Sequence, residues 1–477
     1  MRIKSLDLLR GLAIFAMIFS GRVPWNGVLP GWMYHAQLPP PTNKFNPNFP
    51  GITWVDLVFP FFLFAAGCAI PLALSKKLKN NINNYKIILD ILNRTFLLIF
   101  FSIFLQHTKP YVIASNNPSF DNIIALISLV LMFLIFGNFK NLSRLNNVVL
   151  KLIGFVISFT ILFNIKYPDN SGFKFGRNDI IILVIAINFL FTSIIWLITK
   201  EKPLFRIAIL AFFIALRISS AVNDSWISQL WKCDLLKPIF FFEYLKYLII
   251  MIPATIIGDL FLNLSESVKF ASVYNENKIQ NSVENKEWDD KKYLFIAIIS
   301  FSYIIINIVG LYNRYIFGTT LLNIIISAFL IYLVRKPIDL YEKFVQNSLL
   351  IGIFFILIGL FVEPLQGGIK KDPATYSYLL LTTGLAIQTL ISLSILVDYF
   401  QKDKYFKILI NIGKNPLMAY TGHSHILWPI LFLSGLDNVL NTFMVGPLLG
   451  TLKAFLLTLI LAYFVNNLTE KKYYWKT

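Results

Sequence analysis

Residues 54–75 read WVDLVFPFFLFAAGCAIPLALS, and Asp56 is the only charged residue among them. A helix needs about 20 predominantly apolar residues to cross the hydrocarbon core of a membrane, and this segment meets that requirement. Similar segments recur along the 477-residue chain, of which 56% is hydrophobic and 14% charged. An ordinary soluble domain carries roughly 25% charged residues. The composition therefore predicts an all-α, polytopic protein embedded in a lipid bilayer.

Fourteen segments are apolar enough to be candidate spanning helices. They predict a transmembrane helical bundle of about 11 to 14 helices, because some segments are short enough to be half-spans or re-entrant pieces. The segments 122–137 and 205–220 are short, and removal of either one would invert the topology downstream. The full set is 7–21, 54–75, 87–106, 122–137, 147–165, 179–199, 205–220, 245–263, 293–313, 316–334, 347–363, 378–399, 411–433 and 446–466.

Lysine and arginine are distributed unevenly between the two ends of these segments. If the N-terminus is cytoplasmic, the cytoplasmic loops collect most of them, including Lys76, Lys77, Lys79, Lys402, Lys404 and Lys407. The positive-inside rule then predicts an even number of spans with both termini in the cytoplasm. Topology and contact with anionic lipid account for the net charge of +18, so no nucleic-acid partner is expected.

One segment divides the chain into two membrane halves. Residues 264–292 are polar and mixed in charge, which is typical of a cytoplasmic linker. The N-terminal half, 1–263, contains an extracytoplasmic loop at 22–53, and the C-terminal half covers 293–477. No internal repeat is evident, although inverted repeats can be invisible in a single sequence.

His35 and Asp56 flank the Pro-rich part of the 22–53 loop, at the extracytoplasmic mouth of a predicted helix. A histidine in an ordered loop beside a carboxylate can act as a general base near neutral pH. The carboxylate would then orient the imidazole or stabilise its charged form. The structural alternatives are a solvated loop histidine and a carboxylate that stabilises a helix N-terminus.

Other ionisable groups lie within the predicted helices or at their ends. Arg10 is one turn from Asp7 and forms either a structural ion pair or a site for an anionic cofactor. Arg94 is expected to face a cavity or a partner, because charges inside a membrane are costly. Asp179 and Glu363 are on the same side as His35 and are candidates to line a sugar site. Interfacial anchoring is the alternative for both, and the better explanation for Lys370 and Lys371.

No metal site is expected. The chain has four histidines and two cysteines, without the spacing of a zinc or haem site. His423 and His425 are two residues apart and therefore point to different faces of a helix.

Several short motifs occur in order along the chain: Ser5-Leu6-Asp7-x-x-Arg10-Gly11, His35-Ala36, Asp56-Leu57-Val58-Phe59-Pro60, Lys371-Asp372-Pro373-Ala374-Thr375-Tyr376, and Gly413-x-Asn415-Pro416-Leu417-x-x-Tyr420. Together they resemble the heparan-α-glucosaminide N-acetyltransferase family, including its bacterial DUF5009-type members. The N-terminal motifs are the specific part of this resemblance. It implies a multi-pass protein of the bacterial inner membrane, and a homodimer is compatible with it.

The resemblance implies an acetyltransferase that takes acetyl-CoA from the cytosol and acetylates the amine of a glucosamine on the far side. His35 and Asp56 fall on the catalytic positions of the family. The residues expected at the cofactor are Arg10, Arg94, Lys414 and Asn415. Those expected around the acceptor are Ser20, Asp179, Glu363 and Tyr420. The acetyl group passes either directly to the acceptor or through a transient acyl-imidazole, and the sequence leaves both routes open.

Two departures from the family leave the acceptor open. Ser20 stands where the animal enzyme has an asparagine, and the Pro-rich insert widens the spacing between His35 and Asp56. The expected acceptor is therefore an amino sugar or a cell-envelope glycan, not heparan sulfate itself. The alternatives are an O-acyltransferase that modifies a glycan hydroxyl and a sugar transporter.

Overall fold

The computed structural model describes residues 3–25, 27–137, 143–232, 238–274 and 288–475, and the described residues form helices without any β-strand. Eleven of the described helices are long and apolar enough to cross a membrane. A further pair, Pro416–Leu433 and Leu436–Phe443, passes the same test together but is bent by 87°. The chain is an integral, multi-pass membrane protein, as its composition predicts.

The helices of the first half are α1 (Lys4–Ser20), α2 (Trp54–Lys79), α3 (Asn84–His107), α4 (Pro110–Ile113), α5 (Pro118–Phe136), α6 (Arg144–Asn164), α7 (Ile180–Thr199), α8 (Pro203–Ser219), α9 (Trp226–Trp231) and α10 (Leu248–Tyr274). Those of the second half are α12 (Asp290–Tyr312), α13 (Ile316–Leu333), α14 (Leu340–Phe361), α15 (Tyr376–Ser394), α16 (Lys407–Lys414), α17 (Pro416–Gly422), α18 (Trp428–Leu433), α19 (Leu436–Phe443) and α20 (Pro447–Glu470).

Each of the fourteen predicted segments contains a helix. Eleven of them correspond to the full-length spans, and α1 and α8, with 17 residues each, are slightly shorter. The segment 411–433 is broken between α16 and α17, because Pro416 begins a new helix after Asn415 leaves the helical backbone conformation. A π-helical turn, His423–Leu427, joins α17 to α18.

The predicted linker is shorter in the structure than in the sequence analysis. Helix α10 continues to Tyr274 and α12 begins at Asp290, so both ends of the 264–292 segment are helical. Residues 264–274 contain no glycine or proline, and an established helix propagates easily until a breaker stops it. Residues 275–287 lie outside the described part of the chain.

Helix α15 is the centre of the bundle. Every residue from Ser377 to Ser394 is buried, and the helix packs against α14, α12, α10, α1 and α2. The hydroxyls of Thr382 and Thr383 donate hydrogen bonds to carbonyls of their own helix, at 2.7 Å, which satisfies these polar groups away from water. A helix covered on all sides in this way needs no polar face.

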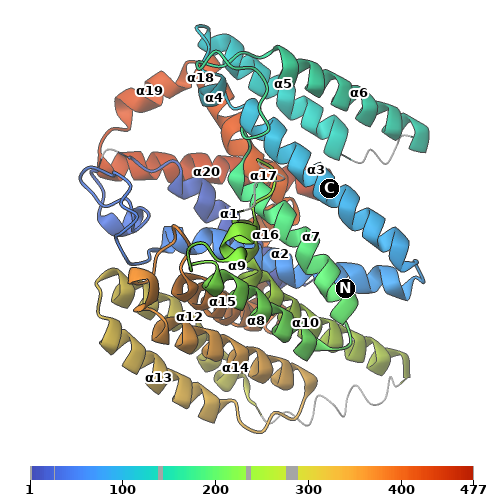
Figure 1. Ribbon diagram of the computed structural model, residues 1–477, viewed down its shortest axis with the longest axis vertical. Coiled ribbons are helices and arrows are strands. Elements are labelled where there is room, and N and C mark those ends of the chain that lie inside the picture. The colour runs from blue at the N-terminus through green and yellow to red at the C-terminus, as the bar shows by residue number, and fades with distance from the viewer. Residues whose placement is uncertain (1–2, 26, 138–142, 233–237, 275–287, 476–477) are drawn as a thin grey trace.

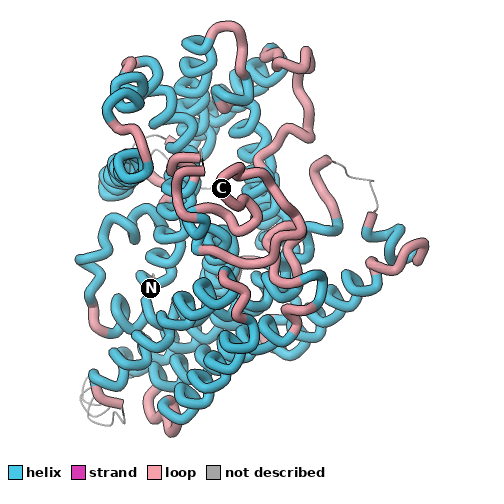
Figure 2. The backbone as a smooth tube through the Cα atoms, turned by 90° about the vertical axis from the view of Figure 1, so that its left-hand side faces the viewer, coloured by secondary structure: helices cyan, strands magenta, loops and turns pink. Residues whose placement is uncertain are grey.

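The two ends of the bundle differ. Both chain termini lie at one end, where Lys4 pairs with Asp403 and Lys407 pairs with Glu470, each at 2.8 Å. The 22–53 loop (dark blue) and the loop after α14 (orange) lie side by side at the opposite end, on the left of Figure 1. Figure 2 looks onto this second end, where loops cover the middle of the bundle.

Candidate active site

His35 and Asp56 are in contact at the loop-covered end of the bundle. The imidazole Nδ1 of His35 lies 2.7 Å from Oδ1 of Asp56. The side chain of Asp56 is 1% exposed and that of His35 is 26% exposed, so the carboxylate is buried beneath a ring that still reaches solvent. A carboxylate accepts hydrogen, so in the uncharged imidazole this contact favours the tautomer with the proton on Nδ1 and the lone pair on Nε2. The contact expected across the Pro-rich insert is therefore present.

The local sequence explains why the Asp56 carboxylate is fixed. Thr53 is the N-cap of α2, and its backbone N–H donates to Oδ2 of Asp56 at 2.9 Å, in a capping box. The backbone N–H of Ala36 donates to the same oxygen at 3.1 Å. One oxygen thus caps the helix while the other contacts His35, so the capping role of Asp56 does not preclude its contact with the histidine.

A lysine from a distant part of the chain reaches the same histidine. Nζ of Lys371 lies 3.3 Å from both ring nitrogens of His35. Lys371 belongs to the segment 364–375, here called the 371 loop. Gln37 ties this loop to the 22–53 loop by donating to the carbonyl of Asp372 at 2.6 Å and accepting from its N–H at 2.9 Å. Lys371 is half-buried at the site.

Glu363 and Ser20, which the sequence suggested for the acceptor, make structural contacts. Glu363 is buried, forms an ion pair with Arg314 at 2.6 Å and accepts the N–H of Ile369 at 3.2 Å, so it anchors the start of the 371 loop. The hydroxyl of Ser20 donates to the carbonyl of Met17 in its own helix at 3.0 Å. The structure joins neither side chain to the His35–Asp56 pair.

Asp179 and Tyr420 come together in a second polar cluster. The Asp179 carboxylate caps α7 and accepts hydrogen bonds from the Tyr420 hydroxyl at 2.9 Å and from Nζ of Lys109 at 2.8 Å. Burial alone would lower the pKa of Lys109, but the nearby Asp179 and Tyr111 raise it above its ordinary value. This cluster links the connection between α3 and α4, which carries Lys109, to α7 and α17 through charge-assisted bonds.

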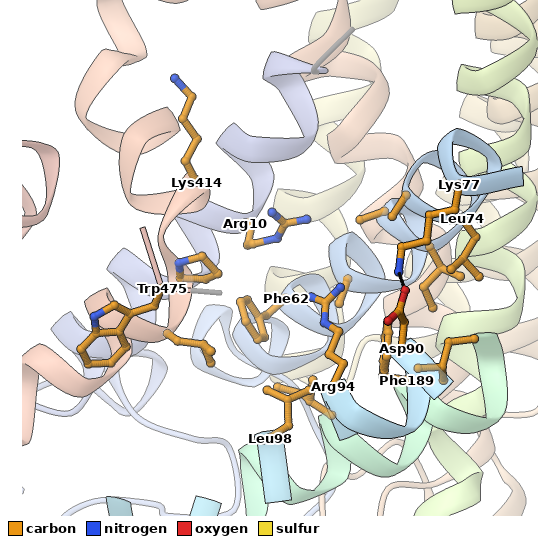
Figure 3. Close-up of a pocket in the computed structure, with 18 residues that line it drawn as sticks. Arg10, Phe62, Leu74, Lys77, Asp90, Arg94, Leu98, Phe189, Lys414 and Trp475 are labelled. Carbon is orange, nitrogen blue, oxygen red and sulfur yellow. Dashed lines mark hydrogen bonds and ion pairs between the residues drawn. The ribbon is translucent and has the colours of Figure 1, made fainter. Parts of the chain in front are cut away.

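A cavity of about 400 Å³ lies nearer the end of the bundle that carries the chain termini. Its polar lining consists of Arg10, Lys77, Asp90, Arg94 and Lys414. Its walls are otherwise apolar and include Phe62, Leu98, Ile185, Phe189, Leu417 and Trp475. Lys77 and Asp90 form an ion pair at 2.7 Å, drawn as a dashed line in Figure 3. The lining therefore carries three more positive than negative side chains.

Arg10 is held in this cavity by a close helix crossing. Helices α1 and α16 approach so tightly that a Cβ on Gly11 or Gly413 would collide with the opposite backbone. The Arg10 guanidinium donates to the carbonyl of Gly413 at 3.1 Å and to that of Ala65 at 3.2 Å. Asp7 lies 3.4 Å away as its ion-pair partner, so part of the positive charge is balanced.

Arg94 is the least compensated charge of the cavity. Its guanidinium lies 4.6 Å from the ring centre of Phe189 and points toward that of Arg10 in Figure 3. Within the described part of the chain, no carboxylate lies at ion-pair distance from it. Two guanidiniums that face one another in a partly apolar cavity form a site suited to an anion.

Lys414 and Asn415 follow one another in the chain but take different places. Nζ of Lys414 lies 2.8 Å from Oδ1 of Asn411, and in Figure 3 the ammonium extends away from the two arginines. Asn415 does not line the cavity. Its fully buried side chain donates to the carbonyl of Tyr473 at 2.8 Å and accepts the N–H of Trp475 at 3.3 Å, so it fixes the C-terminal segment that carries Trp475.

The cavity extends along the same helices that carry the two carboxylates. Phe62 in the cavity is six residues from Asp56 on α2, and Ile185 is six residues from Asp179 at the start of α7. Six residues of helix span about 9 Å. These two apolar lining residues therefore lie about 1.7 helical turns from the carboxylates on the same helices.

Sequence reasoning missed three contributions to these sites. From the sequence, Lys371 is interpreted as an interfacial anchor. Lys77 is counted only among the loop charges, and Asp90 is not singled out. Lys109 was not singled out, although it lies three residues after the predicted span 87–106 and two after His107. One feature of the sequence could have identified Lys371: it begins a motif that precedes the predicted span 378–399, on the same side of the membrane as His35.

Comparisons with known proteins find a family and a relative that this chain resembles. A family model described as a domain of unknown function, DUF5009, matches residues 2–261, which include the 22–53 loop and helices α1 to α9. Human heparan-alpha-glucosaminide N-acetyltransferase is 32% identical over 98 residues, which are 20% of this chain and 13% of the human protein. The aligned part thus spans only a small share of that relative. Because the family model covers more than half of the 477 residues, the chain belongs to the DUF5009 family.

Proposed function

We propose that the protein is a transmembrane N-acetyltransferase, which moves an acetyl group from cytosolic acetyl-CoA to the amine of an amino sugar, glucosamine in type, on the extracytoplasmic side. The observation that carries the proposal is the arrangement along α2. A His35–Asp56 pair lies at one end of the helix, and a cation-lined cavity lies about 9 Å further along it. The similarity to a human N-acetyltransferase supports the same reaction class.

The donor end of the site is suited to a phosphorylated thioester. Arg10 and Arg94 supply guanidiniums that match phosphate geometry, and Lys414 adds a third cation near the bundle end. The apolar side chains deeper in the cavity suit the uncharged arm of the donor. The donor supplies an activated acetyl group at its thioester carbon. The protein's part is to hold the charged end of the donor and to leave the thioester near His35.

The acceptor end of the site supplies a base. An amino-sugar amine is largely protonated near neutral pH, so transfer requires that His35 Nε2 take its proton. The amine nitrogen then bonds to the acetyl carbon, the carbon–sulfur bond breaks, and the departing thiolate takes up a proton. Asp56 stabilises the imidazolium that forms in between. The direct route and the route through an acyl-imidazole both use these residues.

A turnover assay with the purified protein tests the proposal. We expect CoA release in detergent to require both acetyl-CoA and glucosamine. N-acetylglucosamine, in which the amine is blocked, should not replace glucosamine. His35→Ala should lower the rate by about 100-fold or more, as expected for loss of a general base, while the variant elutes as folded protein in gel filtration.

Other outcomes would point to the alternatives. Equal CoA release with N-acetylglucosamine would indicate transfer to a hydroxyl and thus an O-acyltransferase. Uptake of glucosamine into proteoliposomes without acetyl-CoA would indicate a transporter. Full turnover by His35→Ala would remove His35 from the mechanism.

A further inference from the structure

Lys371 approaches His35 in a way that an ordinary hydrogen bond does not explain. Its Nζ is 3.3 Å from Nδ1 and 3.3 Å from Nε2. Each ring nitrogen directs its proton or lone pair outward in the ring plane, and the two directions diverge. An atom equally close to both nitrogens cannot lie along either direction. The ammonium therefore lies against the imidazole ring, where a cation is attracted to an uncharged π system and repelled by a charged one.

Hydrogen bonds to the surrounding backbone fix the position of the loop that carries Lys371. The 371 loop is joined to the 22–53 loop through the N–H of Gly51, which donates to the carbonyl of Ile369 at 2.8 Å, and through both bonds of Gln37 to Asp372. From the other side, Lys246 donates to the carbonyl of Pro373 at 2.8 Å. Lys371 is thus the side chain of an anchored loop and not of a free one.

The charges around His35 act in opposite directions. Asp56 is bonded to Nδ1 and by itself favours the imidazolium, and an imidazole that already carries two protons cannot act as a base. Lys371 adds a like charge, which disfavours the imidazolium. The remaining charged groups that face this part of the site are Asp372 of the same loop, Glu243 and Lys246 before α10, and Arg217 of α8.

We propose that Lys371 is a positioning residue whose charge keeps His35 in the uncharged form that can accept a proton, while Asp56 determines which ring nitrogen carries hydrogen. The kinetic consequence rests on the proposed acetyltransferase function. The coupling between the charge of Lys371 and the protonation of His35 exists whatever the reaction, so it can be measured without turnover.

Chemical modification tests this coupling directly. Diethyl pyrocarbonate reacts with uncharged imidazole and not with imidazolium, so the pH dependence of carbethoxylation of the His35 peptide, followed by mass spectrometry, reports its charge state. In Lys371→Gln we expect the half-maximal rate to move to higher pH by about one unit. In Lys371→Arg, which keeps the charge, and in Lys370→Gln, which removes a neighbouring charge of the same loop, it should stay within about 0.3 units of wild type.

The pH–rate profile of CoA release tests the consequence. Lys371→Gln should lose about tenfold in rate on the acid side of the profile and little on the alkaline side, and Lys371→Arg should restore the wild-type profile. A loss of equal size at every pH would show a merely structural role and overturn the proposal. An unchanged carbethoxylation profile in Lys371→Gln would overturn it as well.

The two readouts also separate the two proposals. If the carbethoxylation profile shifts as expected but no acceptor drives CoA release, the acetyltransferase function fails and the role of Lys371 in setting the charge of His35 stands. If CoA release depends on glucosamine but the carbethoxylation profile does not shift, the role of Lys371 fails and the function stands.

Discussion

At the scale of single residues, Asp56 serves the fold and the site with different oxygen atoms. Oδ2 accepts the backbone N–H groups of Thr53 and Ala36, whereas Oδ1 holds Nδ1 of His35. In Asp56→Asn the amide oxygen should stay with the two N–H donors, so the amide NH₂ would face His35. An NH₂ group there requires an unprotonated Nδ1, which places the proton on Nε2 and removes the base.

We therefore expect Asp56→Asn to lower acceptor-dependent CoA release by about 100- to 10,000-fold. The helix cap is largely retained, so the free energy of unfolding should fall by only about 1 kcal/mol, measured as a small shift of the melting temperature in detergent. Near-normal turnover in this variant would mean that Asp56 acts only as a cap.

A second prediction at this scale concerns Arg94. Its guanidinium faces that of Arg10 across the cavity, and two like charges that face one another repel, which lowers the stability of the free protein. Arg94→Met keeps much of the apolar stem that covers Phe189 and removes the charge. The unliganded variant should be as stable as wild type or more stable, by up to about 1 kcal/mol, and its affinity for CoA should fall tenfold or more.

Thermal unfolding in detergent with and without CoA measures both effects of Arg94→Met. Wild-type protein should gain thermal stability from CoA through linkage, and the variant should gain much less. Lys453→Met, which removes a half-buried charge outside the cavity, should respond to CoA like wild type. An undiminished response to CoA in Arg94→Met would contradict the assignment of Arg94 to the donor.

Whether a contact within the site can be predicted from the sequence depends on how far apart its two residues are along the chain. His35 and Asp56 are 21 positions apart, and each belongs to a short sequence motif, so their contact can be predicted. Lys371 is 336 positions from His35, and only the packed bundle shows that the two loops meet. The residue types at Ser20, Glu363 and Asn415 are suited to binding a ligand. Packing determines whether such a side chain contacts a ligand or a nearby backbone group, and the sequence does not show the packing.

At the scale of elements, the close crossing of α1 and α16 leaves room only for glycine at the contact. A Cβ on Gly413 would collide with the carbonyl of Asp7, and backbone on both sides leaves no flexible side chain to give way. We expect Gly413→Ala to destabilise the protein by about 3 kcal/mol or more. The loss should appear as a lower melting temperature and a lower yield of folded protein.

Gly318 provides the matched control for this prediction. It lies inside α13 with nothing within 4 Å of a Cβ placed there, so alanine adds helix propensity without a clash. Gly318→Ala should be neutral or stabilising by about 0.5–1 kcal/mol. Equal tolerance of alanine at both glycines would show that the crossing can relax, and that Arg10 is not held by it.

Helices were predictable here because length and hydropathy are sufficient where the solvent is lipid. The residues at which helices end or bend were harder to predict from the sequence. Helix α10 continues to Tyr274 because no breaker follows the apolar run, and 411–433 is broken because Pro416 interrupts it. The bend of 87° after Leu433 depends on Gly435, whose positive φ of 72° has no counterpart in a hydropathy profile.

At the scale of the whole molecule, the two sites lie at different depths and are accessible from different ends. His35 reaches solvent at the loop-covered end, and the cation-lined cavity reaches the end with the chain termini, where Asp90 is exposed and Lys77 is half-buried. The distribution of lysine and arginine predicts that the second end is cytoplasmic. A single turnover would then use substrates from both sides of the membrane.

Sealed vesicles of known orientation test this two-sided arrangement. With the cytoplasmic face outward, acetyl-CoA added outside should be consumed only when a membrane-impermeant amino-sugar oligosaccharide is trapped inside. Oligosaccharide added outside together with acetyl-CoA should give little CoA release until detergent opens the vesicles. Vesicles that carry His35→Ala supply the background rate under each condition. Full activity with both substrates outside intact vesicles would place donor and acceptor on one face and contradict a route along α2, because acetyl transfer would then need no path from the cavity to His35.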